Sequence, residues 1–151
     1  MRQNVPVFPD TGSARWHWGE GNKYVIEGGK SLFLLNGAAA AGLLTIIGNG
    51  KAAMNSGLRA AIISFACGSM LSAILFSFGY IAQLHYGQAA RAEEARDWAV
   101  ADARPEAEAA AKVRAEKALA KAMWWHNASY ASAGLSALLF FVGTIVAALN
   151  L

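Results

Sequence analysis

The stretch Ala60–Leu84 reads AAIISFACGSMLSAILFSFGYIAQL and contains no charged residue. Two further stretches, 31–50 and 127–151, are equally apolar and equally free of charge. Each is about 20 residues or longer, which as a helix is enough to cross a hydrocarbon layer ~30 Å thick. The sequence therefore predicts an all-α membrane protein with three transmembrane helices.

The apolar stretches divide the chain into a polar N-terminal segment and a membrane domain. Residues 1–22 include Pro6, Pro9 and several glycines without sustained periodicity, so we expect this segment to be irregular and cytoplasmic. Residues 23–151 form the expected membrane domain, and its first connection, 49–57, is short and rich in turn residues. The first span lies too far from residue 1 to belong to a cleavable signal peptide, and we expect it to act as an uncleaved signal anchor.

The second connection, residues 87–123, differs from the first because it consists mainly of strong helix formers. Its one clear breaker is Pro105, which suits the first turn of a new helix and disfavours helix at the residue before it. We therefore predict one long helix from about Leu58 to about Ala103 and another from Pro105 to the end of the chain. Together they form a long helical hairpin that projects from the membrane into the cytoplasm.

The distribution of lysine and arginine predicts the orientation. With three spans, the N-terminal segment and the second connection lie on one side, and they hold eleven basic residues together. The first connection holds two, Lys51 and Arg59, and the C-terminal end holds none. We expect a bacterial inner-membrane protein whose N-terminus lies in the cytoplasm and whose C-terminus lies outside.

Aromatic and basic side chains occur where the spans are expected to meet the cytoplasmic interface. Amphipathic rings suit that depth, and lysine can extend its ammonium group into the head groups. The expected interfacial residues are Lys30, Tyr86, Trp124 and Trp125. The N-terminal cluster Trp16–His17–Trp18 fits either a place on the interface or a docking epitope for a partner.

Steps of three and four residues trace one contact stripe along each helix of the hairpin. If the chain reverses at residue 104, facing residues have numbers that sum to 208. This register places Phe65 opposite Gly143, and large residues tend to face small ones. The predicted stripes, which we call the seam, are Phe65, Ser69, Ser72, Phe76, Gly79, Gln83, Tyr86, Ala90, Glu93, Asp97 and Val100 on one helix and Ala111, Ala115, Ala118, Ala122, Trp125, Ser129, Ser132, Ser136, Leu139, Gly143 and Val146 on the other.

Small residues let helix backbones approach closely in lipid, where the hydrophobic effect does not drive association. The expected helix-packing residues are Gly37, Ala41, Gly48, Ser69, Ser72, Gly79, Ser129, Ser132, Ser136 and Gly143. The seam serines could alternatively line a pore, although small, weakly polar packing residues are the preferred interpretation. Asn36 lies one turn inside the first span, and its amide either bonds to a neighbouring helix or reaches interfacial water.

No catalytic, metal-binding or cofactor-binding motif stands out. His85 and His126 lie at nearly the same depth, but the seam places them on different flanks, so we do not expect them to ligate haem or metal together. The acidic residues of the second connection indicate a solvated helical face. Basic residues flank apolar spans, which indicates membrane topology and argues against nucleic-acid binding. The single cysteine, Cys67, cannot form an internal disulfide.

These features favour a small non-enzymatic membrane protein that acts through helix packing in the lipid bilayer. It would be an accessory or assembly subunit of a larger membrane complex, or a homo-oligomer. A pore former of the holin or toxin type is the alternative, because alanine- and serine-rich spans without charge suit an oligomeric pore. A redox carrier would rest only on the two interfacial histidines.

Overall fold

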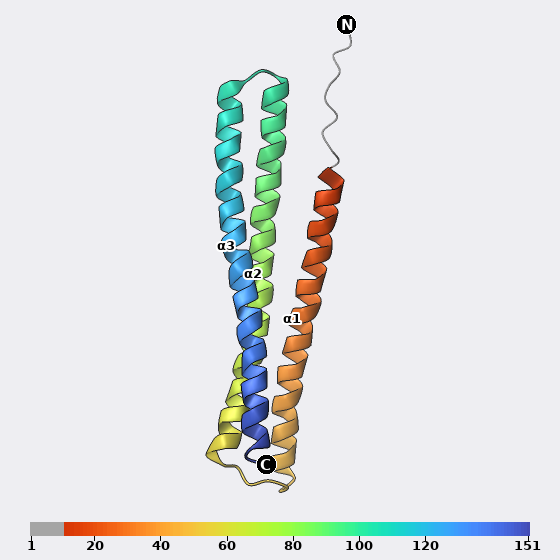
Figure 1. Cartoon of the computed structure of the whole chain (residues 1–151), viewed down its shortest axis with the longest axis vertical. Helices are drawn as coiled ribbons and strands as arrows, with labels where there is room; N and C mark the ends of the chain where they lie inside the picture. Colours follow the sequence, from red (N-terminus) through yellow and green to blue (C-terminus); the bar gives the residue numbers. More distant parts are fainter. Residues whose placement is uncertain (1–10) are drawn as a thin grey trace.

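The computed structural model describes the backbone of residues 11–151 and the side chains of residue 23 and residues 26–151. The described chain folds into three long helices, α1 (Thr11–Gly48), α2 (Ser56–Ala101) and α3 (Pro105–Ala148) (Figure 1). All three contain a segment long and apolar enough to cross a membrane. The predicted all-α membrane fold is confirmed, and so is the hairpin of α2 and α3.

Helix α1 begins well before the first apolar stretch. It starts at Thr11, so the expectation of irregular chain up to residue 22 is wrong for residues 11–22. Helix propagation forms one hydrogen bond for each residue added to an existing helix, which explains how the first span extends through a segment with several glycines. Residues 1–10 and the side chains of the Trp16–Trp18 cluster lie outside the described residues.

Both chain reversals use the same helix-ending motif. After α1, Gly50 has a φ of 69° and the Lys51 N–H donates to the Ile46 carbonyl over 3.1 Å. After α2, Ala103 has a φ of 52° and the Arg104 N–H donates to the Ala99 carbonyl over 2.8 Å. These are Schellman caps, in which a left-handed residue redirects the chain and satisfies the last helical carbonyls.

The start of α3 follows directly from the second cap. Pro105 occupies the first turn, where its missing N–H costs nothing, and Glu106 and Glu108 lie beside it. Carboxylates at this end of a helix interact favourably with the partial positive charge of the helix dipole. The tight reversal and the early start of α3 keep α2 and α3 side by side along their whole length (Figure 1).

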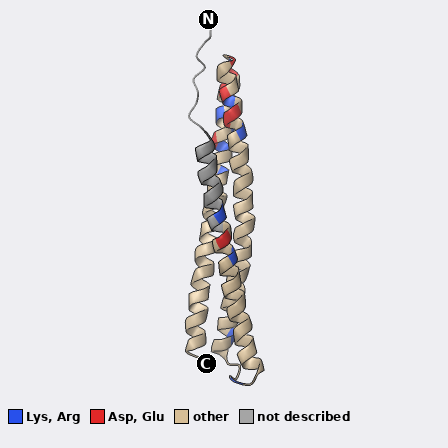
Figure 2. Ribbon diagram, turned by 90° about the vertical axis from the view of Figure 1, so that its right-hand side faces the viewer, with Lys and Arg blue, Asp and Glu red and all other residues tan. Residues whose placement is uncertain are grey.

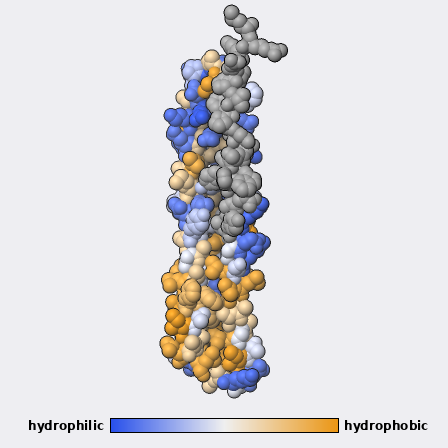
Figure 3. All heavy atoms as spheres, turned by 45° about the vertical axis from the view of Figure 1, so that its right-hand side comes forward, coloured by the Kyte–Doolittle hydropathy of each residue, from blue (hydrophilic) through white to orange (hydrophobic). Residues whose placement is uncertain are grey.

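Helix α1 packs mainly against α2 and contacts α3 much less. It runs closest to the hairpin at the end where the C-terminus lies (Figure 1). There the apolar core consists of Leu43, Leu58, Ala61, Phe65 and Ala147. Apolar surface covers this half of the molecule, whereas the hairpin arm, residues 87–123, carries most of the charged side chains (Figures 2 and 3).

Candidate functional site

The most distinctive site in the described chain is a polar junction where all three helices meet inside the apolar region. Asn36 of α1 is completely buried, as are Ser72 of α2 and Ser136 of α3. The Asn36 amide donates to the Ser136 hydroxyl over 3.2 Å and to the Leu32 carbonyl of its own helix over 2.9 Å. Of the two roles considered for Asn36, a hydrogen bond across to a neighbouring helix is therefore confirmed.

The two serines complete a continuous set of hydrogen bonds. The Ser136 and Ser72 hydroxyl oxygens lie 2.8 Å apart, and both lie within bonding distance of the Gly68 carbonyl, at 2.8 Å and 3.0 Å. One consistent arrangement runs from the Asn36 amide to Ser136, from Ser136 to Ser72, and from Ser72 to the Gly68 carbonyl. Every hydroxyl then has a partner, as burial away from water requires.

Gly68 makes this junction sterically possible. A Cβ atom at this position would collide with the side-chain amide of Asn36, so only glycine leaves room for it. The Asn36 Oδ1 atom is buried without a hydrogen-bond partner and instead faces the Cα of Gly68. Cα–H groups act as weak donors in such close helix contacts, which reduces the cost of burying this oxygen.

The predicted hairpin register agrees with three contacts. Ser72 bonds to Ser136, a Cβ on Gly143 would lie 2.8 Å from the ring of Phe65, and a Cβ on Gly79 would lie 3.8 Å from the Ser129 hydroxyl. Each of these pairs sums to 208. The Ser129 hydroxyl also donates to the Leu75 carbonyl over 3.3 Å, which ties α3 to the backbone of α2.

The predicted α2 stripe is displaced by one residue at every second position. Ser69, Phe76 and Gln83 are only half-buried. The fully buried neighbours that replace them are Gly68, Leu75 and Ala82. The displacement arises because α1 packs against the same flank of α2, so that the most buried line lies between α1 and α3.

On the hairpin arm, Glu93 and Asp97 are exposed, so their predicted seam positions are wrong. Burying a carboxylate without a partner is costly, and alanines occupy the contact instead. The buried residues here are Ala89 and Ala99 of α2 and Ala111, Ala115 and Ala122 of α3. On α3 the buried residues follow the predicted stripe. Ser132 of this stripe is 8% exposed, and its hydroxyl donates to the Ala128 carbonyl of its own helix.

The three helix-packing residues proposed in the first span do not lie together at the hairpin. Gly37 is half-buried, with the Ser69 hydroxyl 3.9 Å from the position of its missing Cβ. Ala41 and Gly48 are exposed, and nothing lies within 4 Å of a Cβ placed on Gly48. Another close contact of α1 with α2 is at Gly29, which sequence reasoning missed and where a Cβ would lie 2.6 Å from Leu75.

A second polar contact, also missed, closes the end of the bundle where the C-terminus lies. Asn55 caps α2 by accepting from the Leu58 N–H over 2.8 Å, and its amide donates to the Asn150 carbonyl over 3.3 Å. The Asn150 side chain packs directly on Gly57. The helix-start signal at Asn55 is visible in the sequence, whereas its pairing with Asn150 spans 95 positions and is not.

Tyr86, Trp124 and Trp125 lie at the boundary between the apolar and charged halves, whereas Lys30 follows Gly29, which packs against Leu75 within the apolar stretch of α2. Lys30 is exposed and pairs with Glu27 over 2.7 Å, and Trp124 is exposed beside half-buried Trp125. The ring of half-buried Tyr86 lies near the ring of His126, with the two centroids 6.1 Å apart. The ring of His126 also contacts the ring of Tyr130, with the centroids 4.5 Å apart. This arrangement forms an aromatic cluster of the kind enriched at membrane interfaces.

The two histidines have separate partners. His85 bonds to Gln88 over 3.1 Å, whereas His126 contributes to the aromatic cluster. Within the described residues, no group of three or more His, Cys, Asp or Glu side chains converges as a metal site would require. Comparison with family models, curated proteins and solved structures finds no match to this chain.

Proposed function

We propose that this protein is a non-enzymatic membrane subunit that acts by associating with another membrane protein or with further copies of itself. The observation that carries this proposal is the outward face of α1. Ala41, Gly42 and Gly48 are exposed in the apolar half of the molecule, and no atom lies within 4 Å of a Cβ placed on either glycine. The packing of α2 against α3 does not involve this face of α1.

Exposed glycines within a transmembrane helix need a reason. Glycine in a helix interior costs about 1 kcal/mol relative to alanine, and packing within the chain does not require it at Gly42. Gly48 is the last residue of α1. Small residues on one face of a membrane helix allow a second helix to approach closely. A second helix against α1 would cover Ala41 and Gly48, which are seven positions apart and share one face, and would bury the surface that the hairpin leaves open.

The seam serines support association over conduction. Ser72 and Ser136 have no exposed surface, and their hydroxyls are bonded to neighbouring helices. Hydroxyls that line a water-filled pore would instead face open space. Within one chain the serines thus serve the packing of α2 against α3.

The proposed orientation places the hairpin arm in the cytoplasm. The described start of α1 and the arm tip point towards the same end of the molecule (Figure 1), as the two spans between them require. By sequence, the N-terminal segment and the second connection hold eleven basic residues and the first connection holds two, a distribution typical of cytoplasmic and external sides. A bacterial inner membrane is the proposed location.

The test compares bulky substitutions on two exposed helix faces. Ala41→Leu with Gly48→Leu should abolish co-purification or self-association in mild detergent while leaving membrane insertion unchanged. Gly134→Leu is the matched control, because Gly134 of α3 is also exposed with nothing within 4 Å of a Cβ. A wild-type protein that runs as a lone monomer without partners would contradict the proposal. Loss of membrane potential or dye entry on expression would favour the pore.

A further inference from the structure

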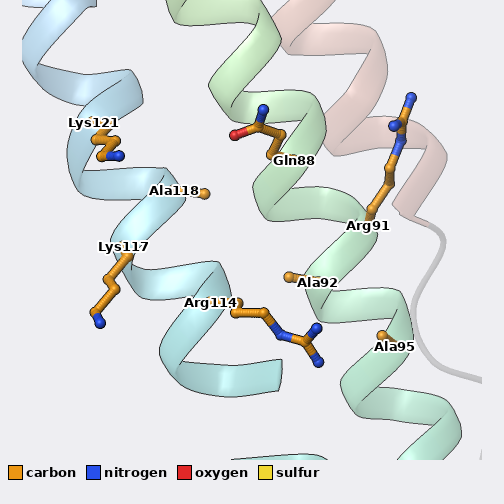
Figure 4. A pocket seen from close by; sticks show the side chains of 8 residues that line it. All are labelled: Gln88, Arg91, Ala92, Ala95, Arg114, Lys117, Ala118 and Lys121. Atoms are coloured by element: carbon orange, nitrogen blue, oxygen red, sulfur yellow. The ribbon is translucent and has the colours of Figure 1, made fainter. Parts of the chain in front are cut away.

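A groove of about 430 Å³ lies between α2 and α3 on one flank of the hairpin arm. Its lining includes four basic side chains, Arg91, Arg114, Lys117 and Lys121, together with Gln88 and three alanines, and no acidic residue. Figure 4 shows Arg114 reaching from α3 towards α2 and Gln88 extending towards α3, while Arg91 and Lys117 point away from the space between the two helices. The groove therefore combines a shallow apolar floor with a basic rim.

The charge in the groove is uncompensated. The ion pairs among the described residues are Lys30–Glu27, Arg96–Asp97 and Arg104–Asp102, and none involves a groove residue. Arg114 donates only to the Ala110 carbonyl of its own helix, over 3.3 Å. Helix geometry explains the separation of charge, since Glu93 and Glu116 project from the opposite flanks of α2 and α3.

The position of the groove along the hairpin arm places its lower end close to the membrane surface. Gln88 is four positions beyond Leu84, where the apolar stretch of α2 ends, which corresponds to about 6 Å along a helix. Lys121 precedes the apolar stretch of α3 by about 9 Å on the same scale. The head-group layer is roughly 5–7 Å thick in each leaflet, and long basic side chains extend several ångströms further. The lower end of the groove therefore meets the head groups.

We propose that this groove binds the phosphate of an anionic phospholipid head group from the adjacent leaflet. Arginine donates to phosphate oxygens through a planar fork, and lysine adds a compact positive charge. The alanine floor leaves room for the glycerol portion of the lipid beside the phosphate. A phosphate at the lower end of the groove would lie nearest to Arg91 and Lys121, would offset the repulsion between these cations and would hold the hairpin upright on the membrane surface.

The experiment measures thermal unfolding of the full chain in neutral detergent with added short-chain phosphatidylglycerol, phosphatidylcholine or inorganic phosphate. Phosphatidylglycerol should raise the melting temperature, and the effect should decline with added salt. In Arg91→Gln with Lys121→Gln, which removes the two basic groove residues nearest the head groups, at least tenfold more phosphatidylglycerol should be needed for the same shift. Lys51→Gln with Arg59→Gln is the matched control, which removes the same charge from the opposite connection and should behave as wild type.

Three results would overturn the proposal. Equal shifts with phosphatidylglycerol and phosphatidylcholine would show that the anionic phosphate is not recognised. A shift of equal size from inorganic phosphate, in competition with the lipid, would assign the groove to a free phosphate compound. An unchanged response in both the Arg91/Lys121 variant and a second variant, Arg114→Gln with Lys117→Gln, would place the lipid elsewhere. The second variant keeps the test decisive if the first variant fails to fold.

Discussion

Gly68→Ala should separate α1 from the hairpin, although it adds only one methyl group. The new Cβ would occupy the space of the Asn36 amide, which cannot withdraw because it is buried and held by Leu32 and Ser136. Overpacking of this kind typically costs ~1–3 kcal/mol. Displacing the amide also removes an interhelical hydrogen bond worth about 0.6 kcal/mol in membrane proteins.

The matched control is Gly42→Ala, because nothing lies within 4 Å of a Cβ at Gly42. Both substitutions gain the same helix propensity, about 1 kcal/mol, so their difference isolates the clash. We expect Gly68→Ala to be about 2–3 kcal/mol less stable than Gly42→Ala when unfolding in bicelles is followed by circular dichroism. Adding Asn36→Ala should restore at least half of the loss, since it removes the group that the methyl strikes.

The reasoning is refuted if Gly68→Ala and Gly42→Ala unfold with the same free energy. It is also refuted if Asn36→Ala makes Gly68→Ala worse by the full cost of the single change. Additive losses would mean that the two residues do not meet, because independent sites add whereas contacting sites do not.

Three further outcomes can be checked. Ala103→Gly should stabilise the hairpin by about 1 kcal/mol, measured as a rise in unfolding free energy, because its φ of 52° strains any residue with a Cβ. With Cys67→Ser as background, Ser72→Cys and Ser136→Cys together should form a disulfide within one chain, and neither alone should; absence of the bond would contradict the 2.8 Å contact. A reporter fused after Leu151 should be detected outside the cytoplasm, and a cytoplasmic signal would reverse the proposed topology.

The helices could be predicted from the sequence because their causes are local. Three uncharged apolar stretches, the breaker Pro105 and the turn residues around Gly50 determine where each helix crosses the membrane and where the chain reverses. The hairpin register followed as well, because a reversal near residue 104 leaves little freedom to antiparallel helices. Ser72 with Ser136 and Phe65 with Gly143 then meet by geometry.

The three-helix junction was decided only by the tertiary structure. Periodicity on α2 does not distinguish Ser69 from Gly68 as the buried position, because either satisfies a stripe of small residues. The choice depends on which flank α1 covers, and that depends on the fit of the Asn36 amide against a residue without a side chain. A polar group buried in lipid must find its partners inside the protein, so the helix that carries Asn36 can dock only where Gly68 makes room and Ser136 accepts its hydrogen bond.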